Sequence, residues 1–155
     1  MIKTSYKARI WLFIFTLLLV VFVLPFCARV QLTAVETVEL FYACWSADDE
    51  KTANTLFSKH FLERHGEPFS FSDYLIYVNL ISCEEVFYPE AVYIDRIEDM
   101  WGEKHTSAAC VRAAFDIAYE ENHGSGFDNT TYHGYYFYLV KKSPIMPWVI
   151  VAYGH

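Results

Sequence analysis

Basic residues are scarce in most of this 155-residue chain. Four of the twelve Lys and Arg residues precede residue 30, whereas all nineteen Asp and Glu residues follow it. The net charge from residue 30 onward is therefore −11. Taken as a whole, a surface this acidic repels nucleic acid and anionic lipid headgroups. This charge balance excludes nucleic acid as a partner.

Several signatures of catalysis are also absent. The chain has no H-E-x-x-H zinc motif, no phosphate-binding glycine loop and no G-x-S-x-G turn. His123 and His133 lack the spacing of a zinc site. We therefore expect neither a metal nor another cofactor, and no residue is assigned a catalytic role from sequence.

Cysteine is equally sparse. Cys27 falls in an apolar run, which leaves Cys44, Cys83 and Cys110, and their spacing matches no disulfide framework or zinc motif. One disulfide with one buried thiol fits this count. Three free thiols that act as small apolar residues fit it slightly better.

The chain does contain a long apolar run over residues 10–28. It carries no charge, and only Thr16 and Pro25 lie outside the apolar set. At about 1.5 Å per residue, a helix of this length crosses a hydrocarbon core of roughly 30 Å with little tilt. The run therefore predicts a transmembrane anchor.

Charge at the ends of the run predicts its orientation. Lys3, Lys7 and Arg9 precede it, against Arg29 alone at the far end. Short segments rich in Lys and Arg stay in the cytoplasm. We expect a cytoplasmic N-terminus (1–9), a membrane anchor (10–28), a linker (29–32) and an extracytoplasmic domain (33–155). The protein should then lie in the cell membrane as a single-pass protein.

Two alternatives to an uncleaved anchor remain open. A signal peptide would be cleaved near the end of the run. Signal peptides typically have a shorter apolar core followed by small residues at the cleavage site, whereas this chain has a longer run and the bulky Phe26 near its end. The sequence around Cys27 faintly resembles a lipoprotein box, which would attach a lipid to that thiol. Both alternatives also leave the domain outside the membrane.

Two helices are predicted at the start of the domain. Thr33 and Glu36 form a capping-box pattern, and apolar residues recur at helical spacing, which predicts a helix over residues 34–46. A second helix is predicted over residues 50–64. Its apolar stripe, on which His60 also falls, comprises Ala53, Leu56, Phe57 and Phe61.

Strands dominate the rest of the domain. They are predicted over residues 80–88, 91–101, 105–120, 132–142 and 148–153, after a short helix that ends at Tyr77. For residues 91–101 a helix is the alternative, because Ile94 and Ile97 fall at helical spacing. Arg112 and Asp116 share the polar face of the long strand 105–120 and are expected to form an exposed pair that contributes little. The predicted core includes Trp45, Phe57, Phe115 and Trp148. Helices followed by antiparallel strands predict an α+β domain.

Two stretches resemble the nuclear transport factor 2-like (cystatin-like) superfamily. They are V-E-L-F-Y-A-C-W-S-A-D-D-E-K over residues 38–51 and G-Y-Y-F-Y-L-V-K-K-S-P-I-M-P-W-V-I over residues 134–150, with the closing Gly154. Within it, the chain is similar to a bacterial family of membrane-anchored or lipoprotein domains of unknown function. The resemblance implies a cone-like, curved antiparallel sheet around a long helix. It implies no single activity, because the superfamily includes both enzymes and non-catalytic subunits.

Members of this superfamily that are enzymes hold an acid–base group among aromatic residues inside the cone. By resemblance, the lining here would include His60, Tyr74, Tyr77, Tyr136 and Trp148. A non-catalytic module that binds a ligand or a protein is favoured, because no acid–base group is securely positioned. The alternative is a small-molecule isomerase or lyase that uses His60 or a strand carboxylate.

The C-terminal hairpin predicts a partner. Strict alternation puts Tyr132, Tyr136 and Tyr138 on one face and His133, Tyr135 and Phe137 on the other. The helices can cover only one face, and monomers rarely leave large apolar patches exposed. Tyr135 and Tyr136 therefore join the predicted binding residues, with a second copy or another envelope protein as partner. Alternatively, the chain's own loops cover the second face.

Overall fold

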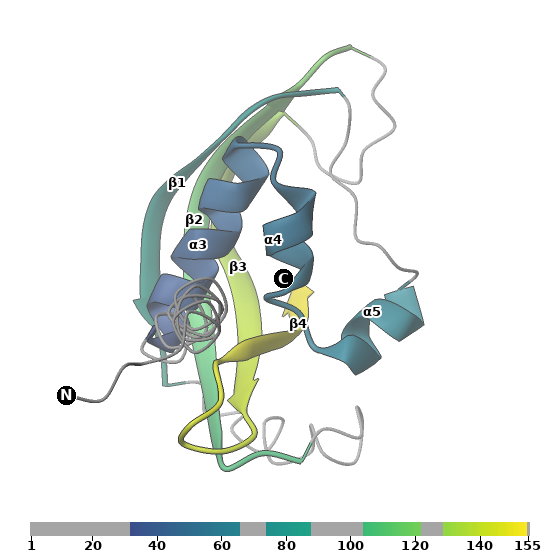
Figure 1. Ribbon diagram of the computed structural model, residues 1–155. Coiled ribbons are helices and arrows are strands. Elements are labelled where there is room, and N and C mark those ends of the chain that lie inside the picture. Colours follow the sequence, from purple (N-terminus) through teal and green to yellow (C-terminus); the bar gives the residue numbers. More distant parts are fainter. Residues whose placement is uncertain (1–31, 66–73, 88–103, 122–128, 155) are drawn as a thin grey trace, which may run out of the picture. The chain divides into compact units, whose positions relative to one another are not determined.

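The computed structural model describes residues 32–65, 74–87, 104–121 and 129–154 (Figure 1). Within these ranges the helices are α3 (Ala34–Ser46), α4 (Glu50–Asn54) and α5 (Lys59–His65). The strands are β1 (Leu75–Glu85), β2 (Ser107–Tyr119), β3 (Thr130–Lys141) and β4 (Val149–Gly154). They form one antiparallel sheet in the order β1-β2-β3-β4, which curves past α3 in Figure 1. The predicted α+β class with helices on a curved antiparallel sheet is confirmed.

Several predicted segments lie outside the described residues. These are the anchor with Cys27, the strand over 91–101 and the first part of the short helix before Tyr77. In the described part of the chain, no helix is both long enough and apolar enough to cross a membrane. The prediction of a short helix before residue 78 is wrong for its described residues, because residues 75–77 belong to β1.

Helix α3 begins and ends where local chemistry dictates. The Thr33 hydroxyl accepts a hydrogen bond from the Glu36 amide (3.1 Å), and the Glu36 carboxylate accepts one from the Thr33 amide (2.7 Å). This reciprocal capping box satisfies two amides that have no partner inside the helix, as the sequence predicted. The carboxylate accepts these bonds in its charged form, which lowers the pKa of Glu36.

The C-terminal end of α3 closes with a left-handed residue. Asp48 has φ +56°, and its amide and that of Asp49 bond back to the carbonyls of Trp45 (3.3 Å) and Cys44 (2.9 Å). This is the Schellman arrangement, in which glycine usually occupies the left-handed position. An aspartate there tolerates the conformation at some cost in free energy.

The predicted second helix is wrong in its continuity, because residues 55–58 leave the helix and contact β4. The amide of Ile150 donates to the Leu56 carbonyl (2.8 Å), and the amide of Ser58 donates to the Ile150 carbonyl (2.9 Å). The Ser58 hydroxyl then accepts from the Phe61 amide (3.1 Å), which starts α5. Hydrogen bonds to the strand replace those that a continuous helix would make. The predicted stripe is nevertheless buried: Ala53, Leu56, Phe57 and Phe61.

The strands predicted in the last third of the domain are confirmed to within a few residues. β2 presents alternate residues to the core, as its pattern predicted: Ala109, Val111, Ala113, Phe115, Ile117 and Tyr119 are all buried. Of the predicted core residues, Trp45, Phe57 and Phe115 are buried. Trp148 is only half-buried, because it precedes β4 and its ring lies beneath Lys141 Nζ (5.8 Å to the centroid).

A β-bulge changes the faces of the C-terminal hairpin. Tyr132 pairs with Phe115 and Tyr135 with Ala113, so two residues of β3 oppose Ala114 alone. Tyr132 therefore turns toward the helices, where its ring stacks on Phe115 (5.1 Å between centroids). The predicted grouping of Tyr132 with Tyr136 was wrong, because strict alternation fails across a bulge.

Candidate functional site

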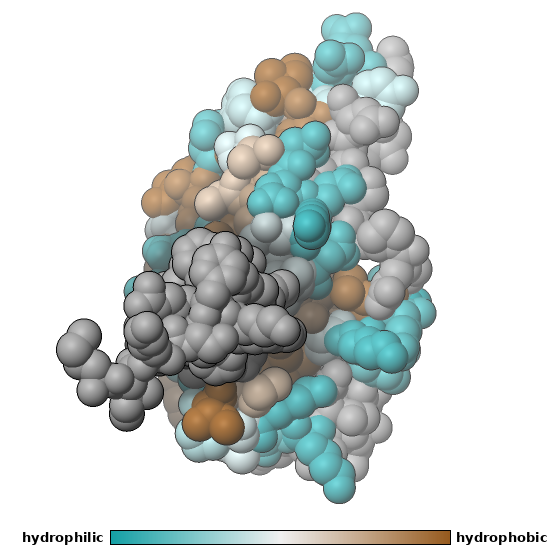
Figure 2. Space-filling model, in the orientation of Figure 1, coloured by the Kyte–Doolittle hydropathy of each residue, from teal (hydrophilic) through white to brown (hydrophobic). Residues whose placement is uncertain are grey.

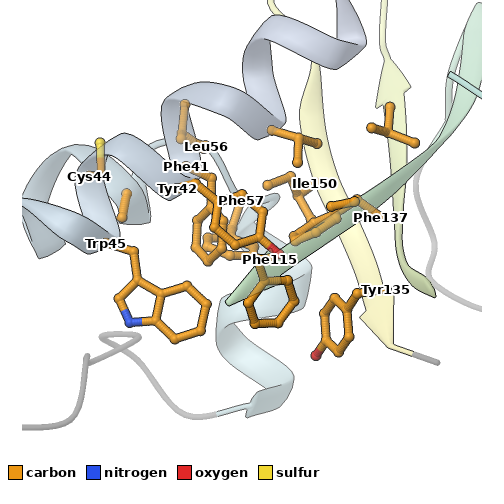
Figure 3. Close-up of a cluster of buried hydrophobic side chains, with 14 of the residues drawn as sticks. Phe41, Tyr42, Cys44, Trp45, Leu56, Phe57, Phe115, Tyr135, Phe137 and Ile150 are labelled. Carbon is orange, nitrogen blue, oxygen red and sulfur yellow. The ribbon is translucent and has the colours of Figure 1, made fainter. Parts of the chain in front are cut away.

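The space between α3 and the sheet is filled by aromatic rings (Figure 3). Phe41, Tyr42 and Trp45 of α3 face Phe115 of β2 and Phe137 of β3. The centroid of Tyr42 lies 5.1 Å from that of Phe115, and the centroid of Phe41 lies 5.6 Å from that of Phe137. Tilted and edge-to-face rings at such separations are in contact. This aromatic interior is thus packed by the chain's own side chains.

The polar side-chain groups described in the aromatic interior include phenols, two thiols and the buried indole N–H of Trp45. The Tyr42 hydroxyl is buried and has no hydrogen-bond partner among the described residues. Burial raises the pKa of Tyr42 and of Tyr135 far above the usual range of a phenol. Burial likewise raises the pKa of Cys83 to about 12, and its thiol lies 3.9 Å from the Val35 carbonyl. These groups stay protonated at neutral pH, so they can donate hydrogen bonds but cannot serve as bases.

The three described cysteines are free thiols, Cys44 and Cys110 buried and Cys83 half-buried. The slightly favoured prediction, that they act as small apolar residues, is confirmed. Burial raises the pKa of Cys110 to about 11. Among the described residues, no group of three His, Cys, Asp or Glu side chains could hold a metal ion.

The face of the sheet turned away from α3 carries two polar rows. In the first, the Arg112 guanidinium pairs with the Glu84 carboxylate on β1 (Nε to Oε1, 3.1 Å) and also interacts with Tyr136 on β3. In the second, the Asp116 carboxylate accepts a hydrogen bond from the Tyr77 hydroxyl on β1 (3.0 Å). The predicted pair of Arg112 with Asp116 was wrong, because each has a partner directly across the sheet.

The second row continues onto β3, where the Thr131 hydroxyl donates to Asp116 Oδ1 (3.2 Å). The bond from Tyr77 to the charged carboxylate raises the pKa of Tyr77. Both rows are open to solvent, so each contributes little to stability. They make the outer face of β1, β2 and the start of β3 a mixed surface of tyrosines, small residues and charges. Further along the C-terminal hairpin, Val140 and Val151 are fully buried in a second apolar cluster with Ala108, Tyr138 and Val149.

The six predicted binding residues do not form one site. Tyr135 is buried in the aromatic interior, whereas Tyr136 is half-buried on the outer face. His60 lies exposed on α5 instead of on the apolar stripe, since the break at residues 55–58 changes the phase of the helix. Trp148 lies near the β3–β4 turn. Tyr74 and Tyr77 alone lie together, at the start of β1.

Exposed apolar side chains gather along β1, which ends the described sheet. Tyr74, Ile76, Tyr77 and Ile81 are 40–61% exposed. Ile76 and Ile81 each sit at a register shift against β2, so each lacks a cross-strand partner there. We name Tyr74, Ile76, Tyr77 and Ile81 the β1 edge patch. Sequence reasoning found its tyrosines but missed its isoleucines, because a bulge leaves no signal in an alternating pattern.

On the visible face of the space-filling view, brown apolar residues are interspersed with teal hydrophilic ones (Figure 2). Comparisons of the chain with protein-family models, with curated proteins and with solved structures found no match.

Proposed function

We propose that this protein is a single-pass membrane protein whose extracytoplasmic domain binds another protein and has no catalytic role. The apolar run over residues 10–28 serves as the anchor, with the N-terminus in the cytoplasm. The domain belongs to the cone-like architecture of the nuclear transport factor 2-like superfamily. The helix α3 against a curved sheet and the aromatic interior support that assignment.

The chemistry of the aromatic interior supports binding over catalysis. An isomerase or lyase of this architecture would need a titratable group inside the domain, poised near neutral pH. The titratable groups described there are phenols and thiols whose pKa values burial raises. His60, the strongest candidate from sequence, is exposed on α5.

The β1 edge patch is the single observation that carries the proposal. A monomer normally covers or blunts the outer strand of a sheet, since its open edge and apolar side chains invite pairing with another chain. Here the strand instead keeps large apolar side chains exposed, with Ile76 at 61% and Ile81 at 58%. The outer face of the sheet adds Tyr136 to the two tyrosines of the patch, and tyrosine concentrates binding energy at interfaces. The partner is a second copy or another envelope protein.

Sedimentation of the full chain in mild detergent tests the proposal, together with photo-cross-linking from position 76 in native membranes. We expect a discrete complex that Ile81→Lys disrupts, because a lysine on an edge strand opposes strand pairing. Ala43→Lys is the matched control, since it adds the same charge at an exposed position of α3. A monomer in detergent, with no protein adduct from position 76 in membranes, would refute binding through this patch.

A further inference from the structure

The turn between β3 and β4 presents two exposed apolar residues. The Met146 amide donates to the Ser143 carbonyl (3.0 Å), which closes a β-turn with Pro144 at its second position. Asp48 is the one non-glycine residue with positive φ among those described, so Ile145 has negative φ and the turn is not of type II. Proline fixes its own φ, which limits how far the turn can rearrange. The backbone that carries Ile145 and Met146 is therefore restrained at residue 144.

These side chains face solvent to an unusual extent. Ile145 is 75% exposed and Met146 40% exposed. They are flanked by Lys142 on one side and by Trp148 on the other, with Lys141 Nζ over the Trp148 ring. Apolar side chains between lysines and a tryptophan are typical of segments in the membrane interface, where the ring sits at headgroup depth and lysines reach the phosphates.

The charge of this hairpin is opposite to that of the domain. Residues 129–155 contain two lysines and no Asp or Glu, although the chain from residue 30 onward carries −11. Lys104 lies at the same end of the sheet, because the nearby Thr106 amide donates to the Lys141 carbonyl (2.8 Å). Three of the eight basic residues after residue 29 thus lie at this end, together with Glu84 and Glu85 at the end of β1; Glu84 pairs with Arg112. A local basic cluster attracts anionic headgroups even when the net charge repels them.

The hairpin also lies at the end of the domain where the chain enters it (Figure 1). The Cys83 thiol contacts the Val35 carbonyl, which places the end of β1 beside the first turn of α3. Ser107, at the start of β2, pairs with Lys141 at the end of β3. Phe87, 91% exposed, follows β1 at this same end.

We propose that the β3–β4 turn, residues 142–148, inserts Ile145 and Met146 into the interface of the membrane that holds the anchor. The lysines beside it contact anionic headgroups. This inference rests on the anchor in the proposed function, because the anchor would hold the domain at the bilayer. The occupant is the lipid surface and not a protein partner, because the turn combines exposed apolar side chains with adjacent lysines and a tryptophan.

The test uses the full chain reconstituted into vesicles of phosphatidylcholine and phosphatidylglycerol. Ile145→p-benzoylphenylalanine carries a photo-cross-linker at the tip of the turn, and mass spectrometry reads the lipid adduct. Tyr74→p-benzoylphenylalanine is the matched control, because it is exposed at the opposite end of β1. We expect a strong lipid adduct from position 145 and little from position 74. A second substitution, Met146→Asp, should remove most of the adduct without unfolding the domain.

Carbonate extraction of the same vesicles separates the two proposals. A chain that resists extraction but yields no more lipid adduct from position 145 than from position 74 would overturn the inference and leave the anchor intact. A chain that carbonate extracts would overturn both. Vesicles of phosphatidylcholine alone should give a lower yield, and an equal yield would overturn the contribution of the lysines.

Discussion

Replacing Phe57 with alanine tests how residues 55–58 hold the helices to the sheet. Phe57 is 4% exposed, and its ring lies 5.5 Å from that of Phe41 and 5.0 Å from that of Phe61. Its backbone also bridges to Ile150 of β4. The alanine variant loses the transfer free energy of the ring and leaves a cavity between α3, α5 and β4.

Such a change costs about 3–5 kcal/mol in the free energy of unfolding. Edge-to-face and stacked ring contacts favour the upper half of that range, since each aromatic pair adds about 0.5–1.5 kcal/mol beyond the buried area. For a fragment of roughly 125 residues, the expected fall in Tm is about 12–20 °C.

Thermal and urea unfolding of the fragment over residues 30–155, followed by near-UV circular dichroism, measures the change. Phe87→Ala is the matched control, because Phe87 is the same residue type at 91% exposure. It should shift the free energy of unfolding by no more than about 0.5 kcal/mol. Equal effects of the two substitutions would refute the packing of Phe57 between the helices and β4.

Three further predictions concern caps and thiols. Asp48→Gly should raise the free energy of unfolding by about 0.5–1 kcal/mol, because glycine takes the left-handed φ without strain. Urea unfolding measures the change, and a lower stability of the variant would contradict the left-handed C-cap. Thr33→Ala should lower the free energy of unfolding by about 1 kcal/mol, with Thr33→Ser as the matched control that keeps the hydroxyl. The pKa of Cys83 (about 12) and of Cys110 (about 11) lies above the ordinary thiol value of 9.0. The burial of these two protonated thiols therefore stabilises the fold fully below about pH 9, and this contribution is lost as pH rises through the folded pKa values. We expect the urea midpoint of unfolding to fall between pH 8 and about 11. A constant midpoint over this range would contradict the burial of the thiols.

Local signals in the sequence predicted helix α3 and strand β2 closely. The capping box of Thr33 and Glu36 needs only residues three apart, and the alternation of β2 repeats over thirteen residues. Signals of this kind are complete within the segment itself. Nothing in the tertiary fold was needed to interpret them.

Tertiary contacts explain where the sequence prediction failed. The stripe of the second helix continues smoothly through Phe57, yet the chain breaks there because Ile150, far along the sequence, takes the hydrogen bonds of Leu56 and Ser58. The bulge opposite Ala114 likewise turns Tyr132 inward. Neither event leaves a local mark in the sequence. The break exposed His60, and two further bulges, in β1, left Ile76 and Ile81 of the β1 edge patch without cross-strand partners.

The two proposed surfaces suggest one orientation of the domain. The β1 edge patch begins at Tyr74, beside the Glu120 amide at the end of β2, whereas the β3–β4 turn lies at the end where β2 starts. These are opposite ends of the same strand, which spans about 40 Å over thirteen residues at roughly 3.3 Å each. If the turn contacts the membrane, Tyr74 and Ile76 stand farthest from it and meet partners that approach from the aqueous side. A photo-cross-linker at position 76 should then capture protein and one at position 145 should capture lipid, and an exchange of these products would refute the orientation.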